Sequence, residues 1–324
     1  MTTKQDNPRA GYQLERHAGN PILTPADFPG ADAVFNCGQV QAGDDTVLLV
    51  SVIHRSGHYR GTKGATTHVA RSRDGVRFEI DPVPFLQKPD THPLSEIDHH
   101  PIDTRVTPLD GWYYIVHPGC GPWGTLAILG RTKDFGSYEF LDIISLPDNR
   151  GVSLFPEKIG GHYMRLDRPY RVAPNEHHTD GNIWIARSPD LMHWGHFRPL
   201  LRPGFSPWAA TKVGPTPPIR TDKGWLTIIH GVSQSCAGYR YALGAMLLDL
   251  EDPARVIGLT RSYILAPETQ YERLGSVPNV VFACGAIADE GEDRIRVYYG
   301  GADTCICLAT GSLSGLADAC LCDE

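Results

Sequence analysis

Three stretches of similar sequence decide the fold: VARSRDGVRF at Val69–Phe78, LGRTKDFGSY at Leu129–Tyr138 and IARSPDLMHW at Ile185–Trp194. Their shared arginines are 60 and 56 residues apart, and each copy continues through Ser or Thr and Asp to an aromatic return. Degenerate copies, GAMLLDLEDP at Gly244–Pro253 and CLATGSLSGL at Cys307–Leu316, follow at similar intervals. Five copies account for most of the chain, so the sequence predicts a fold of five repeats.

The repeats consist of short β-rich runs separated by turn signals. Examples are TVLLVSV at Thr46–Val52, WYYIVH at Trp112–His117 and WLTIIH at Trp225–His230, and the 34 Gly and 26 Pro are spread throughout. Such a chain is all-β. A repeat of this kind cannot bury its own faces, whereas radial stacking of four-stranded sheets can. We expect one five-bladed β-propeller domain over residues 1–324, with Tyr12–Leu23 closing the last blade. A solenoid is the alternative, but its repeats are usually shorter.

Composition excludes several classes of protein. The 324 residues include 30 Lys and Arg against 37 Asp and Glu, a net charge of −7 that argues against a broad nucleic-acid surface. No run approaches 18 apolar residues, so no membrane partner is expected. The first twenty residues lack an apolar core, so we expect no secretory signal. The eight cysteines form no CxxC motif and are interpreted as free thiols in a reducing cytoplasm.

A second set of equivalent positions recurs in the same repeats. A strand precedes each of the runs above, and at or just before the five inner strands stand Asn36, Asp103, Arg150, Lys212 and Asn279. The strands that follow them end 14 to 24 residues later. These ends are Arg55, His117, Arg168, His230 and Asp303. Because an antiparallel hairpin returns its end beside its beginning, all ten residues should gather at one mouth of the central channel.

The expected mouth combines two carboxylates, Asp103 and Asp303, with several cations and two histidines. Carboxylates hydrogen-bond hydroxyl groups, and the planar fork of Arg suits phosphate, so a sugar plus an anion is indicated. Salt bridging is the structural alternative for Arg150 and Arg168. Asp103 opens an inner strand and is the best candidate for an acid.

No metal is expected at this mouth. Neighbouring residues on a strand face opposite ways, so His99 and His100 are poorly placed to share an ion, and Glu176–His178 is interpreted as a polar loop. A zinc site formed by Cys305, Cys307, Cys320 and Cys322 is a minor alternative. The chain has no GxGxxG, P-loop lysine or GxSxG motif, so dinucleotide, nucleotide and serine-hydrolase functions lack support.

These motifs resemble glycoside hydrolase family 130, the β-mannoside phosphorylases and related β-mannosidases. The similar stretches are Asn20–Val40, Pro101–Thr107, Asn149–Pro169, Lys212–Val232, Tyr239–Pro253, VPNVVFACGAI from Val277 and VYYGGADTCICLATG from Val297. The resemblance covers nearly the whole chain and implies a five-bladed β-propeller. Three positions depart from the family pattern: Ile102 stands where the family usually has Glu, and Thr104 and Cys37 stand where it usually has Pro.

The resemblance implies a role for each matching residue. Asp103 is the single catalytic acid. Phosphate is held by Arg150, Arg168 and His230, joined by Tyr241. The mannose subsite is lined by Asn36, Arg55, Lys212 and Asp303.

The implied activity is that of an inverting β-mannoside phosphorylase with no cofactor, in which inorganic phosphate is the co-substrate. Phosphate attacks C1 while Asp103 supplies a proton, by way of the mannose 3-hydroxyl, and α-mannose 1-phosphate leaves. An anionic nucleophile needs no carboxylate base. The alternatives are a β-1,2-mannosidase of the same family and a propeller that only binds glycans. Several family members are oligomers, so a homo-oligomer is one expectation.

The sequence leaves the linkage and the acceptor sugar open, because the leaving-group subsite is built by loops, which vary most. Candidates for that subsite are Glu96–His100, Cys120–Trp123, Asn175–Asp180 and Ser233–Gly238.

Overall fold

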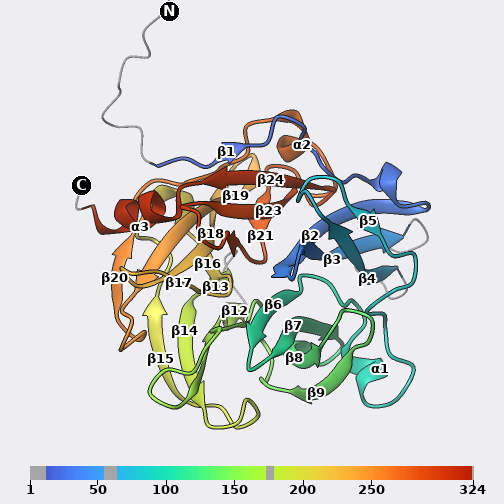
Figure 1. Cartoon of the computed structure of the whole chain (residues 1–324), viewed down its shortest axis with the longest axis horizontal. Helices are drawn as coiled ribbons and strands as arrows, with labels where there is room; N and C mark the ends of the chain where they lie inside the picture. Colours follow the sequence, from blue (N-terminus) through green and yellow to red (C-terminus); the bar gives the residue numbers. More distant parts are fainter. Residues whose placement is uncertain (1–11, 55–63, 173–178, 323–324) are drawn as a thin grey trace, which may run out of the picture.

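The computed structural model describes residues 12–54, 64–172 and 179–322. Its strands form five sheets arranged around a central axis, as in a five-bladed β-propeller (Figure 1). The all-β fold class and the five blades expected from the repeats are therefore confirmed. No helix in the described ranges is long and apolar enough to cross a lipid bilayer.

The first two blades are regular four-stranded antiparallel sheets. Blade 1 consists of β2 (Ala31–Ala42), β3 (Asp45–His54), β4 (Ala65–Ser72) and β5 (Glu79–Ile80). Blade 2 consists of β6 (Arg105–Leu109), β7 (Trp112–Gly121), β8 (Gly124–Thr132) and β9 (Glu139–Ile143).

Blades 3 and 4 are linked by an extra hairpin. Blade 3 consists of β10 (Ser153–Leu154), β11 (Tyr163–Asp167), β14 (Ile183–Ser188) and β15 (Gly195–Leu201). Blade 4 consists of β16 (Lys212–Pro215), β17 (Ile219–Arg220), β18 (Trp225–Ser235), β19 (Gly238–Leu248) and β20 (Val256–Leu259). The hairpin of β12 (Tyr170–Val172) and β13 (Thr179–Gly181) leaves blade 3 and pairs in parallel with β16, at Gly181 and Lys212.

Blade 5 combines the two ends of the chain. It consists of β21 (Val281–Ala283), β22 (Ile287–Ala288), β23 (Ile295–Gly301) and β24 (Cys305–Gly311), with β1 (Glu15–Arg16) paired to β24 as its outermost strand. Leu23 adds a further bridge to Ile306. The segment Tyr12–Leu23 thus lies against strand β24, where the sequence placed it.

The repeated Ser/Thr and Asp residues mark the turn after the third strand of a blade. The Asp74 carboxylate accepts hydrogen bonds from the backbone of Val76 and Arg77, and Asp190 repeats this pattern with Met192 and His193. An Asp that caps its own turn in this way replaces backbone partners that the turn would otherwise lack. The phrase that reveals the repeat is therefore a turn signal.

Apolar clusters fill the interfaces between neighbouring blades. Between blades 1 and 2, for example, Val47 and Leu49 pack in one cluster with Val106 and Ile115. Separate clusters join blades 2 and 3, 3 and 4, 4 and 5, and 5 and 1. Each blade thus buries both of its faces against neighbours, which is what a repeat with two apolar faces requires.

The helices are short and lie outside the sheets. They are η1 (Pro25–Asp27), α1 (Leu94–Ile97), η2 (Pro207–Ala209), α2 (Gln270–Arg273) and α3 (Leu313–Leu321). Helix α3 packs on β19 and β20 at the rim. All eight cysteines carry free thiols, and the two on β24, Cys305 and Cys307, have sulfur atoms 3.9 Å apart.

Candidate functional site

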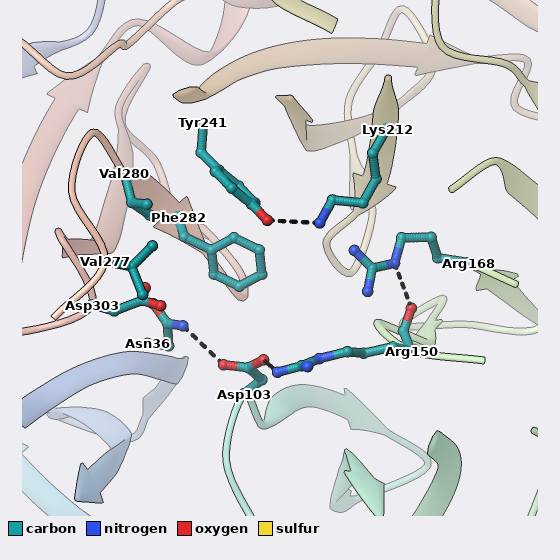
Figure 2. Close-up of a pocket in the computed structure, with 10 residues that line it drawn as sticks. All are labelled: Asn36, Asp103, Arg150, Arg168, Lys212, Tyr241, Val277, Val280, Phe282 and Asp303. Atoms are coloured by element: carbon teal, nitrogen blue, oxygen red, sulfur yellow. Dashed lines mark hydrogen bonds and ion pairs between the residues drawn. The ribbon is translucent and has the colours of Figure 1, made fainter. Parts of the chain in front are cut away.

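A pocket of about 140 Å³ opens where the inner strands converge (Figure 2). The residues that line it come from all five blades, including the segment between β19 of blade 4 and β21 of blade 5. The lining residues are Asn36, Asp103, Arg150, Arg168, Lys212, Tyr241, Val277, Val280, Phe282 and Asp303. Seven of the nine site residues expected from the sequence are in this set. An eighth, His230, lies against Arg168, while Arg55 lies outside the described residues.

Left-handed backbone brings several of these side chains to the mouth. The φ angles are 39° at Asn36, 55° at Asp103 and 48° at Asp303, and Gly151, next to Arg150, has 84°. Asn36 is also the extra residue of a bulge between Phe35 and Cys37 in β2. Asn, Asp and Gly tolerate this region best, and residues held there commonly cost about 1–3 kcal/mol each. Backbone strain of this kind gathers at functional sites, where the surrounding structure maintains it.

Asp103 lies buried at the floor of the pocket with both carboxylate oxygens engaged. Asn36 donates its amide to Oδ1 at 2.9 Å, and the Arg150 guanidinium forms an ion pair with Oδ2. Burial alone would raise the pKa of the Asp103 carboxyl. The positive charges of Arg150 and Arg105 outweigh burial and hold that pKa below its usual range, so the group is a carboxylate in the ligand-free protein.

Arg168 and His230 form the second part of the site. The Nε of Arg168 donates to the Arg150 carbonyl at 3.0 Å, and its Nη1 lies 3.1 Å from Nε2 of His230. Because a guanidinium only donates, His230 accepts with Nε2 and carries its proton on Nδ1. Burial and the nearby charges of Arg150 and Arg105 lower the pKa of Arg168 to about 10. Burial and Arg168 likewise hold the pKa of His230 well below its usual value, which keeps the imidazole neutral.

Lys212 and Tyr241 complete the cationic side. The Lys212 ammonium donates to the Tyr241 hydroxyl at 2.7 Å. Burial, followed by Arg168 and Arg150, lowers the pKa of Lys212 well below its usual value. Three basic side chains, Arg150, Arg168 and Lys212, therefore line one small pocket where they repel one another. An anion bound there would relieve that repulsion.

Asp303 lies on the opposite side of the pocket, near Asn36 (Figure 2). Burial, and then the negative charge of Asp103, raise the pKa of Asp303 to about 7. The two carboxyl groups thus differ in protonation at neutral pH although they share a pocket. Asp103 is ionised and paired, whereas the pKa of Asp303 is raised to about 7.

Two of the ten residues expected at the mouth do not line the pocket with their side chains. His117 is buried, and its Nε2 lies 2.9 Å from the Asp98 carboxylate. It lines a separate small cavity in blade 2. Asn279 contributes its backbone carbonyl, which accepts from the Tyr241 amide. The expectation that all ten would gather at one mouth was wrong for the His117 side chain, whereas Asn279 lies beside the pocket through its backbone. The hairpin rule places the backbone, but a partner such as Asp98 can draw the side chain away.

The sequence reasoning did not predict the parts that three residues play beside Asp103. Arg105 is 2% exposed, donates to the Asp103 carbonyl at 2.6 Å and adds positive charge beneath the pocket. The Ser51 hydroxyl donates to the Asn36 carbonyl and accepts from the Asp103 amide, so it joins blades 1 and 2 at the acid. Thr104, at a position where the family usually has Pro, donates to the Leu49 carbonyl and accepts from the Gly38 amide.

Two of the expected leaving-group loops, Glu96–His100 and Cys120–Trp123, contact each other beside blade 2. The His99 amide donates to the Cys120 carbonyl at 3.1 Å, and the indole of Trp123 lies 3.5 Å from a Glu96 carboxylate oxygen. Trp123 is 66% exposed. The tip after β7 is also tied to the stretch before Arg150, because the Asn149 amide donates to the Thr125 carbonyl.

Of the other two expected loops, the structure describes one only in part and the other in full. Residues 175–178 lie outside the described residues, and Ser233–Gly238 forms the tip of the long β18–β19 hairpin. Across the described ranges, no group of three or more His, Cys, Asp or Glu side chains is arranged to hold a metal ion. This includes the four cysteines considered for zinc.

Known proteins with a similar sequence or structure are named as phosphorylases of mannosides, in keeping with a pocket suited to a sugar and a phosphate. Beta-1,4-mannooligosaccharide phosphorylase of Ruminococcus albus is 30% identical over 94% of this chain and 89% of its own length. The 1,2-beta-oligomannan phosphorylase of a Thermoanaerobacter species is 35% identical over 92% of this chain and 96% of its own. The solved complex of beta-1,2-mannobiose phosphorylase from Listeria innocua with beta-1,2-mannobiose superposes with a TM-score of 0.83 at 30% identity, covering 95% of this chain and 99% of that one.

A family model, Glyco_hydro_130, described as beta-1,4-mannooligosaccharide phosphorylase, matches residues 20–321. The match thus spans all five blades and every described residue that lines the pocket. The chain belongs to glycoside hydrolase family 130.

Proposed function

We propose that this protein is an inverting β-mannoside phosphorylase that cleaves a β-linked mannosyl unit with inorganic phosphate and releases α-D-mannose 1-phosphate. The observation that carries the proposal is the cluster of Arg150, Arg168 and Lys212 in one pocket with the Asp103 carboxyl. The names of the related phosphorylases support the same activity. Phosphate is the co-substrate, and no resident cofactor is part of the proposal.

Each side chain has a part in this reaction. Arg150, Arg168 and the neutral His230, with Tyr241 beside them, hold and orient the phosphate, since charged donors aimed at an anion stabilise its charge as it attacks. Asp103 gives a proton toward the glycosidic oxygen. Bond formation to C1 from the face opposite the leaving group inverts the configuration.

The mannose unit lies on the other side of the pocket. Asn36, Lys212 and Asp303 offer an amide, an ammonium and a carboxyl group as partners for sugar hydroxyls, and Arg55 is proposed for the same subsite. Because the pKa of Asp303 is raised to about 7, its carboxyl can donate when protonated as well as accept, which suits a hydroxyl that needs both.

The leaving-group side is proposed to run over the blade 2 rim. Trp123 presents an exposed indole beside Glu96, and an aromatic face with a neighbouring carboxylate is the combination that stacks on a pyranose ring and binds its hydroxyls. We assign the acceptor sugar to this rim. The linkage, β-1,4 or β-1,2, depends on which acceptor hydroxyl that surface directs toward C1.

Phosphate dependence tests the proposal. Purified enzyme is incubated with β-1,2-mannobiose, β-1,4-mannobiose and β-1,4-mannosyl-glucose, with and without phosphate, and the products are separated by chromatography. A phosphorylase gives mannose 1-phosphate only with phosphate present. Free mannose at equal rates in phosphate-free buffer would identify a hydrolase, and no turnover of any β-mannoside would favour a glycan-binding propeller.

Two further proposals concern the protein in the cell. Eight free thiols are typical of a reducing compartment, so we place the protein in the cytoplasm, which cell fractionation tests. A homo-oligomer is proposed on the family resemblance alone. Light scattering after gel filtration measures the mass of the assembly directly.

A further inference from the structure

The ion pair between Arg150 and Asp103 poses a problem for catalysis. A general acid must carry a proton, yet both oxygens of the Asp103 carboxylate accept from donors, Asn36 on Oδ1 and Arg150 on Oδ2. The charged donor on one oxygen and the amide on the other both favour the ionised carboxylate over its protonated form. The ligand-free enzyme therefore holds its acid in the state that cannot donate.

The other charged groups around Asp103 do not resolve the problem. Arg105 lies beneath the carboxyl and favours the ionised form, as does the more distant Lys212. Asp303 opposes them when it is ionised, but its own pKa is raised to about 7. Arg168, Cys120 and Cys284 are the remaining titratable groups coupled to Asp103. His100 is within electrostatic reach of Arg150, and its lowered pKa leaves it neutral.

Arg150 differs from the other arginines of the site in its access to solvent. Its side chain is 30% exposed, whereas Arg168 and Arg105 are 6% and 2% exposed as residues. Arg168 also donates to the backbone carbonyl of Arg150, and both side chains line the same small pocket, so a phosphate held by Arg168 lies close to Arg150. One guanidinium is thus available both to the acid and to an incoming anion.

We propose that phosphate binding loads Asp103 with the proton it later donates, because the dianion takes over Arg150 as a partner and leaves the carboxyl to bind a proton from solvent. This inference rests on the proposed phosphorylase activity. Its direction holds even if the ion pair is only weakened, since a dianion close to a carboxylate repels its charge. Arg150 is then a switch between substrate binding and acid catalysis.

The protons taken up and released over one catalytic cycle are equal in number. Asp103 gains one proton as hydrogen phosphate binds. In the reaction the C1–oxygen bond to the leaving group breaks, a bond from phosphate oxygen to C1 forms, and the Asp103 proton passes to the leaving oxygen. The mannose 1-phosphate releases the proton that hydrogen phosphate brought, and Asp103 returns to its ion pair with Arg150. An enzyme without phosphate keeps its acid ionised, which limits wasteful transfer of mannose to water.

Calorimetry of anion binding tests the proposal directly. Phosphate is titrated into wild type and Asp103→Asn at pH 7 in two buffers of different ionisation enthalpy, which reports the protons taken up per anion bound. Sulfate, which does not titrate near pH 7, is run in parallel. Phosphate that binds as the dianion releases a proton from its monoanionic fraction at pH 7, so the readout is the difference between the two proteins. Wild type should take up close to one proton more per anion than Asp103→Asn, and with sulfate that uptake should appear directly. Asp303→Asn is the matched control and should keep most of the uptake.

The outcomes separate this proposal from the proposed function. Binding without proton uptake, or uptake lost in Asp303→Asn but kept in Asp103→Asn, overturns the switch while leaving a phosphorylase. An enzyme that needs no phosphate to cleave mannosides overturns both.

Kinetics provide a second readout, which also applies if phosphate binds tightly only together with the mannoside. The basic limb of the pH profile for kcat/KM of the mannoside should move up by about 1–3 pH units between low and saturating phosphate, the usual effect of removing an opposite charge. In Arg150→Gln the limb should already lie high and should move with phosphate much less than in wild type, by the direct repulsion alone. A residue that only binds phosphate would raise KM for phosphate without moving the limb, and that result would overturn the proposal.

Discussion

The guanidinium of Arg168 lies 3.1 Å from Nε2 of His230, and the two residues are held there by neighbouring blades although 62 positions separate them. Both are buried, and both have lowered pKa values because burial and neighbouring cations disfavour a further positive charge. The pair is therefore costly to the ligand-free protein. A phosphate dianion bound beside the pair would offset that cost with its negative charge.

Replacing Arg168 separates binding from stability. Arg168→Ala should raise the KM for phosphate about 10–100-fold, because a charged hydrogen bond contributes roughly 1.5–3 kcal/mol. The melting temperature without phosphate should change little or rise, since a buried cation among cations is removed. Steady-state kinetics and a thermal melt measure the two effects. A large drop in melting temperature would mean that Arg168 is structural.

Phosphate should stabilise the wild-type protein by mass action. At a concentration 100 times the dissociation constant, a ligand that binds only the folded state adds about 2.7 kcal/mol. Arg168→Ala should gain far less at the same concentration. Melts across a phosphate series, with chloride at matched ionic strength as the control, measure the difference. Equal stabilisation of both proteins would remove Arg168 from the phosphate site.

Asp103 should be essential to turnover but not to anion binding. Asp103→Asn keeps the size and an acceptor oxygen, so the fold should persist while the rate falls by at least 10²–10⁴, the usual scale for general acid catalysis. Because the substitution also frees Arg150 from its carboxylate, phosphate should bind more tightly than to wild type. Near-normal phosphorolysis by this variant would exclude Asp103 as the acid.

The repeat and hairpin reasoning located most of this site, and its failures have physical reasons. Asp103 and Arg150 come just before the inner strands β6 and β10, and their position in the repeat was enough to bring them together. Arg105 was missed because it faces the protein interior one strand position beyond the mouth, where charge is not expected. The position of His117 was predicted wrongly because no residue near it in the sequence indicates its pairing with Asp98, 19 residues earlier. Positive φ at Asn36 and Asp103 also needs the tertiary structure to maintain it.

Asp303 should make the ligand-free protein sensitive to pH. Its pKa rises from 3.8 to about 7 on folding, so its stabilising contribution is complete below pH 3.8 and is lost as pH rises toward 7. Asp303→Asn removes that loss. The melting temperature of the variant relative to wild type should therefore increase between pH 4 and pH 7 and then level off. Asp90→Asn, an exposed carboxylate on the surface, should track wild type throughout.

Trp123 should govern the acceptor rather than the chemistry. Its indole is 66% exposed at the tip after β7 and contacts Glu96, so it contributes little to the core. Trp123→Ala should leave the melting temperature and the KM for phosphate nearly unchanged. In the synthetic direction, with mannose 1-phosphate as donor, it should raise the KM for the sugar acceptor about 10-fold, as loss of one stacking contact of roughly 1–1.5 kcal/mol predicts. Phe197→Ala supplies the matched control, because Phe197 is 54% exposed on the outer strand β15 of blade 3. Acceptor kinetics that change equally in both variants, or in neither, would place the leaving-group subsite away from the blade 2 rim and favour the β18–β19 hairpin tip.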